Sequence, residues 1–119
     1  MTGGQMAPTT LVGQKTATTP WGRNPGNGDG WPLKVSEMLA TLEGVAYAAR
    51  TTITNPQNVL KTKNCIKKAF TNQIEKKGFS IVEVLSPCPT VWQKEPPQAM
   101  KWIEEEMAKV FPLGIIKDR

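Results

Sequence analysis

The fold is decided by residues 45–85, which read VAYAARTTITNPQNVLKTKNCIKKAFTNQIEKKGFSIVEVL. The stretch opens with the short apolar run 45–49, which predicts a buried strand. It closes with the run 81–85, whose nearly continuous apolar character is typical of a strand covered on both faces. Between them, Asn55 and Pro56 indicate a helix start, because Asn caps free amides and Pro fits the first helical position.

The helix that follows is expected to end at Gly78. Its apolar residues recur at helical spacing on one face, namely Val59, Ile66, Phe70 and Ile74. Strand, helix and strand in this order predict a βαβ unit with parallel strands and a right-handed crossover. The expected fold class is therefore α/β, with a partial parallel sheet.

One flanking helix is expected before Gly44, and a last helix is expected to begin near Pro97. The predicted core consists of Leu39, Leu42, Ala48, Phe70, Val82, Val84, Ile103 and Met107. Two parallel strands make a poor sheet by themselves, since parallel sheets are buried on both faces and usually have more strands. We therefore expect the chain to be part of a larger α/β domain.

Residues 1–32 differ in composition from residues 33–119. Glycine and proline interrupt them throughout, and no periodic apolar pattern runs through them. We divide the chain into this long irregular segment and an α/β portion, 33–119. Tryptophans 21, 31 and 92 all lie in expected loops, where we expect them to face other subunits.

The composition excludes several classes of protein. The 119 residues include no histidine, which excludes a His-based triad and a His-rich zinc site. Two cysteines cannot form a disulfide framework, so the expected location is a reducing cytoplasm. No apolar run approaches the roughly 20 residues that span a bilayer, and the first residues lack the features of a signal peptide. The net charge of +5 owes much to the lysines of the long helix, which we interpret as a solvated face rather than a nucleic-acid surface.

Two places in the sequence are candidate sites. Cys88, in the run SPCPT at 86–90, follows the second strand, where open α/β sheets bind ligands. It is either a metal-ligating or redox thiol, or a small buried apolar residue, whereas Cys65 is interpreted as structural. Thr2-Gly3-Gly4-Gln5 combines paired glycines, which let a ligand approach the backbone, with hydrogen-bonding side chains. Residues 1–5 also occur in a common expression-tag leader, but the sequence from Met6 departs from it, so we interpret the segment as native.

With these residues in view, the chain resembles the carboxyl-terminal half of the β subunit of 2-oxoacid:ferredoxin oxidoreductases, of the type acting on 2-oxoglutarate or 2-ketoisovalerate. The resemblance covers essentially the whole chain. It rests on the order and spacing of short motifs: MTGGQ at 1–5 running into PTT at 8–10, TTPWGR at 18–23, EMLA at 37–40, AAR at 48–50 before NP at 55–56, KKAF at 67–70, and GF at 78–79 leading to SPCPT at 86–90.

The resemblance implies a chemistry. In this family the β subunit binds thiamine diphosphate and Mg²⁺, carries a [4Fe–4S] cluster, and pairs with an α subunit and ferredoxin-like subunits. The enzyme decarboxylates a 2-oxoacid oxidatively, makes an acyl-CoA and passes electrons to ferredoxin. Carried onto this sequence, Thr2, Gly3, Gly4 and Gln5 match the loop that lines the diphosphate, and Cys88 matches the fourth cluster ligand.

The chain also departs from the family. The other three cluster cysteines and the metal-binding Asp and Asn lie upstream of Met1 in the family, and Cys65 cannot replace three thiolates. The tripeptide Gly28-Asp29-Gly30 is interpreted as an exposed turn, because no buried strand precedes it. We therefore expect the isolated chain to bind no cofactor and to be inactive without the missing amino-terminal half or an equivalent chain.

Two alternatives remain. One is a small α/β binding module that uses the lysine-rich helix for an acidic partner or nucleic acid. The other is a truncated or degenerate domain that forms a homo-oligomer to cover its open sheet edges.

Overall fold

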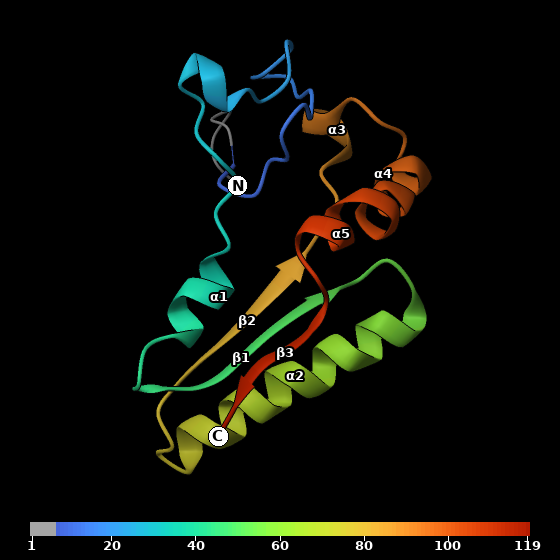
Figure 1. The fold of residues 1–119 in the computed structure, drawn as a ribbon. Coiled ribbons are helices and arrows are strands. Elements are labelled where there is room, and N and C mark those ends of the chain that lie inside the picture. Colours follow the sequence, from blue (N-terminus) through green and yellow to red (C-terminus); the bar gives the residue numbers. More distant parts are fainter. Residues whose placement is uncertain (1–6) are drawn as a thin grey trace.

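The computed structural model describes residues 7–119 and shows a three-stranded sheet between helices (Figure 1). Its strands are β1 (Val45–Thr52), β2 (Phe79–Leu85) and β3 (Gly114–Asp118), in the order β2-β1-β3. β1 pairs with β2 in parallel and with β3 in antiparallel orientation. The predicted α/β class with a parallel βαβ unit is confirmed.

The crossover helix α2 (Pro56–Ile74) begins as predicted. The Asn55 Oδ1 accepts a hydrogen bond from the Asn58 amide at 2.9 Å, and Pro56 occupies the first turn. The helix ends at Ile74, four residues before the expected Gly78. Gly78 instead opens the turn into β2 with a φ of +133°, where a Cβ would lie 2.6 Å from the Gly44 carbonyl oxygen. Only glycine fits this close approach.

The remaining elements lie on one face of the sheet or beyond the carboxyl ends of β1 and β2 (Figure 1). Helix α1 (Val35–Ala40) covers the face opposite α2, and η1 (Pro25–Asn27) is a single 3₁₀ turn in the amino-terminal segment. A nearly continuous helix near the carboxyl terminus consists of α4 (Pro96–Trp102), the π turn η2 (Ile103–Met107) and α5 (Ala108–Val110), and is preceded by the short α3 (Pro89–Trp92).

Strand β3 is absent from the sequence-based prediction, which contains two strands and ends in a helix. The run Gly114-Ile115-Ile116-Lys117-Asp118 is too short to show a clear period, and its place in the sheet depends on tertiary pairing with β1. The sheet is therefore mixed, with one antiparallel edge strand beside the parallel pair.

The core has two parts. All eight residues of β1 are buried, and a second cluster contains Leu11, Leu85, Ile103, Met107 and Phe111. The predicted core positions Ala48, Ile103 and Met107 are buried as expected.

Other predicted core positions differ. Leu39, Val82 and Val84 are half buried, whereas the predictions for Leu42 and Phe70 are wrong, since these residues are 54% and 67% exposed. Phe70 is exposed because α2 packs on the sheet through a polar face. Thr62 and Asn72 are buried there, and the Thr62 hydroxyl donates to the Thr52 carbonyl at 3.0 Å.

Candidate functional site

The segment that holds Cys88 follows the carboxyl end of β2, as predicted. Cys88 precedes the first turn of α3, Pro89 starts that helix, and the Cys88 carbonyl accepts a hydrogen bond from the Trp92 amide at 2.9 Å. Its thiol is unpaired and the residue is half buried. Cys88 is therefore partly accessible at the carboxyl end of β2, and its role as a metal ligand or redox thiol stays a prediction.

The amino-terminal segment packs against the same end of the sheet (Figure 1). The Ala17 amide donates to the Val91 carbonyl in α3 at 2.8 Å, and Leu11 enters the core cluster beside Leu85. The segment that begins with the predicted cofactor loop is thereby joined to the element that follows Cys88. The loop residues Thr2, Gly3, Gly4 and Gln5 themselves lie outside the described residues.

Arg23 holds the amino-terminal segment together. Its side chain is buried and donates to six backbone carbonyls, those of Ala7, Pro8, Thr10, Asp29, Gly30 and Trp31, at 2.9–3.2 Å. No carboxylate pairs with it among residues 7–119. Because all five guanidinium donors are used, the charge is stabilised by carbonyl dipoles alone. The predicted turn at 28–30 forms part of this arrangement, with Gly28 and Gly30 exposed and at positive φ.

A second buried cation, Arg50, lies on the α1 face of the sheet. Its guanidinium forms a bidentate pair with Glu37 of α1 and donates from Nε to Glu83 of β2 at 2.9 Å. The Ser36 hydroxyl also donates to Glu83, at 2.5 Å, and the guanidinium carbon lies 5.1 Å from the centre of the Phe111 ring. The cluster joins two strands to α1.

The charges of this cluster support one another. The hydrogen bond from Arg50 holds the pKa of Glu37 below its usual value against the opposing effect of burial. Burial lowers the pKa of Arg50, but hydrogen bonds with Glu37 and the charge of Glu83 more than reverse this, so that its pKa is raised. The arrangement fits a structural role, since both carboxylates pair with the same guanidinium and connect α1 to the two strands.

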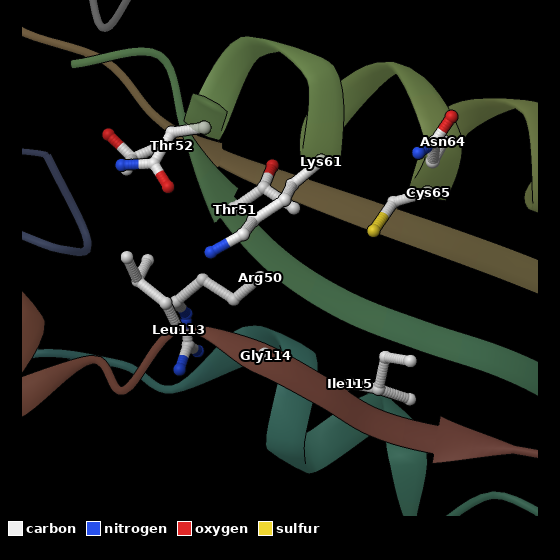
Figure 2. A pocket seen from close by; sticks show the side chains of 10 residues that line it. Arg50, Thr51, Thr52, Lys61, Asn64, Cys65, Leu113, Gly114 and Ile115 are labelled. Atoms are coloured by element: carbon white, nitrogen blue, oxygen red, sulfur yellow. The ribbon is translucent and has the colours of Figure 1, made fainter. Parts of the chain in front are cut away.

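A pocket of about 360 Å³ opens between α2 and β3 (Figure 2). Lys61 and Cys65 reach into it from α2, and Leu113 and Ile115 line its other wall. Tyr47 lies beside Cys65, and burial together with that neighbour raises the pKa of the phenol. Cys88 is not among the lining residues, so the two cysteines belong to separate places in the fold.

Residues 7–119 do not complete a metal centre. They contain no group of three or more His, Cys, Asp or Glu side chains arranged to hold a metal ion. No helix within the described range is long and apolar enough to cross a membrane. Of the predicted site, the structure therefore describes one thiol, Cys88, and the segment that leads from the cofactor loop toward it.

The two buried arginines were not singled out as site residues from the sequence. Arg50 is part of the AAR motif and Arg23 of TTPWGR, but neither motif indicates burial. Glu83, a charged residue in the middle of the apolar run 81–85, is the one local signal that a buried cation lies opposite it.

Comparison with known proteins places this α/β segment among relatives of 2-oxoacid oxidoreductase subunits. The chain is 43% identical over all 119 residues to the ketoisovalerate oxidoreductase subunit VorA of Methanothermobacter thermautotrophicus, and 42% identical to VorA of Methanothermobacter marburgensis. It is 36% identical over 109 residues to the 2-oxoglutarate synthase subunit KorB of Archaeoglobus fulgidus. No protein-family model matches the chain, and no solved structure matches it.

The chain spans only a part of these relatives. It corresponds to 25% of the length of each VorA subunit and to 36% of the KorB subunit, while the alignments cover 100% and 92% of this chain. The chain is thus homologous, along nearly all of its length, to a segment of 2-oxoacid oxidoreductase subunits.

Proposed function

We propose that the chain is part of the β subunit of a thiamine-diphosphate-dependent 2-oxoacid:ferredoxin oxidoreductase. Such an enzyme decarboxylates a 2-oxoacid oxidatively, forms an acyl-CoA and passes electrons to ferredoxin. The observation that carries the proposal is the similarity over the whole chain to VorA, together with the weaker similarity to KorB. Two relatives that act on different 2-oxoacids leave the choice between 2-ketoisovalerate and 2-oxoglutarate to experiment.

In this proposal the chain supplies one wall of the cofactor site. Thr2, Gly3, Gly4 and Gln5 line the diphosphate, and Cys88 is one ligand of a [4Fe–4S] cluster. The position of the Cys88 segment at the carboxyl end of β2, joined to the amino-terminal segment through Ala17, supports this assignment. Thiamine diphosphate supplies the carbanion chemistry of such enzymes, while the protein binds and orients it.

The cluster needs ligands from elsewhere. A [4Fe–4S] cluster requires four thiolates that converge on one site, and residues 7–119 contain only Cys65 and Cys88, in separate places. We therefore propose that the site is completed by a further polypeptide portion, with an α subunit and ferredoxin-like subunits as partners, and that the isolated chain is inactive. A cytoplasmic location agrees with two unpaired thiols.

The test compares the chain alone with the chain inserted into a complete subunit. This chain replaces the matched segment of VorA from M. thermautotrophicus, and the hybrid is assembled with its partner subunits. We expect no viologen reduction by the chain alone with thiamine diphosphate, Mg²⁺, CoA and either 2-oxoacid, and reduction by the hybrid.

Two matched variants of the hybrid test the site residue. Cys88→Ser should lower the iron content and abolish the cluster signal in electron paramagnetic resonance, whereas Cys65→Ser should change neither. Dye reduction by the chain alone, or an unchanged cluster in Cys88→Ser, would contradict the proposal.

A further inference from the structure

The long helix α2 carries an exposed apolar stripe. Val59, Ile66, Phe70 and Ile74 are 47%, 40%, 67% and 80% exposed, and their spacing places them on one side of the helix. Because the polar residues Thr62 and Asn72 face the sheet instead, this stripe has no partner among the described residues. Exposed apolar stripes of this length are typical of surfaces that another protein segment covers.

The stripe lies on the side of α2 that faces the open edge of β2. The opposite side of the helix is identified by its contacts with β3: Lys61 shares a pocket with Ile115, and the Lys68 ammonium lies 3.3 Å from the Asp118 carboxylate. At about 100° per residue, the centre of the stripe is roughly 180° around the helix from these lysines. It therefore points away from β3, along the side where β2 lies.

Strand β2 has an unpaired outer edge. In the order β2-β1-β3 it is an end strand, and in Figure 1 no strand lies beyond it within residues 7–119. Its apolar residues Ile81, Val82 and Val84 are only half buried, although parallel strands are normally covered on both faces. An unpaired apolar edge strand is a ready template for a further strand.

The charge around the stripe is of one sign. Helix α2 contains four lysines and no acidic residue. Lys63 and Lys67 flank the stripe, and neither forms an ion pair within the described part of the chain. A helix that packs on the stripe would gain from acidic residues along its rim.

We propose that the β2 edge and the α2 stripe together form one docking face for a β–α unit from the rest of the longer subunit. The strand of this unit pairs in parallel with β2, and its helix, apolar on one face and acidic along the rim, covers Phe70 and Ile74. The proposal rests on the proposed function, since the relatives are roughly three to four times as long as this chain and provide the polypeptide that would dock.

A second copy of this chain fits the face less well. A two-fold axis through the β2 edges would pair the strands in antiparallel orientation and place two α2 helices near each other. Each helix carries four lysines and no acidic residue, so the pair would repel. The open edge and the uniform charge therefore favour a different, acidic partner.

The test uses thiol labelling in the isolated chain and in the VorA hybrid described above. Phe70→Cys and Ile74→Cys report on the docking face, and Ile115→Cys, 62% exposed on the opposite edge of the sheet, is the matched control. Maleimide modification of each introduced thiol is followed by mass spectrometry of the peptide that contains it. We expect the two thiols on the docking face to react at least about tenfold more slowly in the hybrid than in the isolated chain, and the control to react at a similar rate in both.

A second measurement does not depend on folding of the hybrid. The isolated chain is titrated with a VorA subunit that lacks the matched segment, and Phe70→Glu should weaken the binding at least about tenfold while Ile115→Glu does not. The inference would be overturned if the thiols on the docking face react at equal rates in the isolated chain and in the hybrid, or if all three thiols are slowed alike. It would also be overturned if self-association of the isolated chain protects the stripe, or if Phe70→Glu does not weaken binding.

Neither measurement requires thiamine diphosphate, a cluster or turnover. A hybrid that protects the stripe but reduces no dye would count against the proposed function only. An active hybrid with a freely labelled stripe would count against the docking face only.

Discussion

Replacing Arg50 by methionine removes the cation that pairs with two carboxylates on the α1 face of the sheet. Methionine retains much of the length of the arginine side chain and its packing beside Phe111, so the change acts mainly on charge and hydrogen bonding. What remains is Glu83, whose side chain is 18% exposed, and Glu37, whose side chain is 34% exposed, with no cation between them.

The magnitude follows from these exposures. Removing one partner of a buried ion pair costs about 3–5 kcal/mol, because the other charge stays buried and unpaired. The Glu83 contribution applies nearly in full, whereas that of Glu37 is reduced by solvent screening. The lost contact of the guanidinium with Phe111, about 0.5–2 kcal/mol, is largely offset by the contact of the methionine sulfur with the same ring, about 0.3–1.5 kcal/mol. We expect Arg50→Met to lower the free energy of unfolding by about 3–5 kcal/mol.

The assay is equilibrium urea unfolding at neutral pH, with a matched triple variant as control. Adding Glu37→Gln and Glu83→Gln to Arg50→Met removes the unpaired charges and should restore more than half of the lost free energy. A loss below about 1 kcal/mol for Arg50→Met, or a triple variant no more stable than the single one, would show that the cluster does not hold the sheet and α1 together.

Three further predictions concern other parts of the fold. Because the folded-state pKa of Glu37 is lowered, its stabilising effect is present above the ordinary value of 4.5 and is lost as the pH falls toward the folded-state pKa. In urea unfolding across the acid range, the free energy of unfolding should therefore fall less steeply with pH in Glu37→Gln than in the unaltered chain. Identical dependence on pH in the two proteins would contradict this. Arg23→Lys keeps the positive charge but loses the planar guanidinium that binds several carbonyls at once. Amide hydrogen exchange in residues 7–31 should therefore accelerate at least about tenfold, while exchange in β1 is unchanged. Uniform acceleration along the chain would indicate global destabilisation instead. Gly78→Ala should lower the free energy of unfolding by about 2–3 kcal/mol because of its positive φ and the nearby Gly44 oxygen. Gly44→Ala serves as the near-neutral control, since no atom lies within 4 Å of a Cβ added there.

Local signals in the sequence were sufficient for the parallel βαβ unit. Asn55 and Pro56 determine the start of α2 through a side-chain cap and a fixed φ, both of which act within a few residues. The apolar runs of β1 and β2 likewise identify strands without knowledge of the rest of the fold. Where the determinant was local, the prediction agreed with the structure.

Where a feature depends on residues far away in the sequence, the prediction was wrong or was not made. Phe70 was assigned to the core because apolar residues at helical spacing usually face a sheet, but α2 presents Thr62 and Asn72 to it instead. Strand β3 is specified by pairing with β1, which lies far earlier in the chain. The partners of Arg23 are backbone carbonyls, which every residue has, so its burial leaves no pattern in the sequence.

The two buried arginines, Arg23 and Arg50, hold two different parts of the molecule together, and their hydrogen bonds respond differently to acid. The carbonyl groups around Arg23 do not take up protons, so the hydrogen bonds of its guanidinium should persist as the solution is acidified. The contact of Arg50 with Glu37 depends on a carboxylate whose pKa is lowered, so it is lost only as the pH falls below the ordinary value of 4.5 toward the folded-state pKa. Acid strong enough to protonate Glu37 should therefore loosen α1 from the sheet while the hydrogen bonds of Arg23 persist, so that α1 separates before the segment that leads toward Cys88.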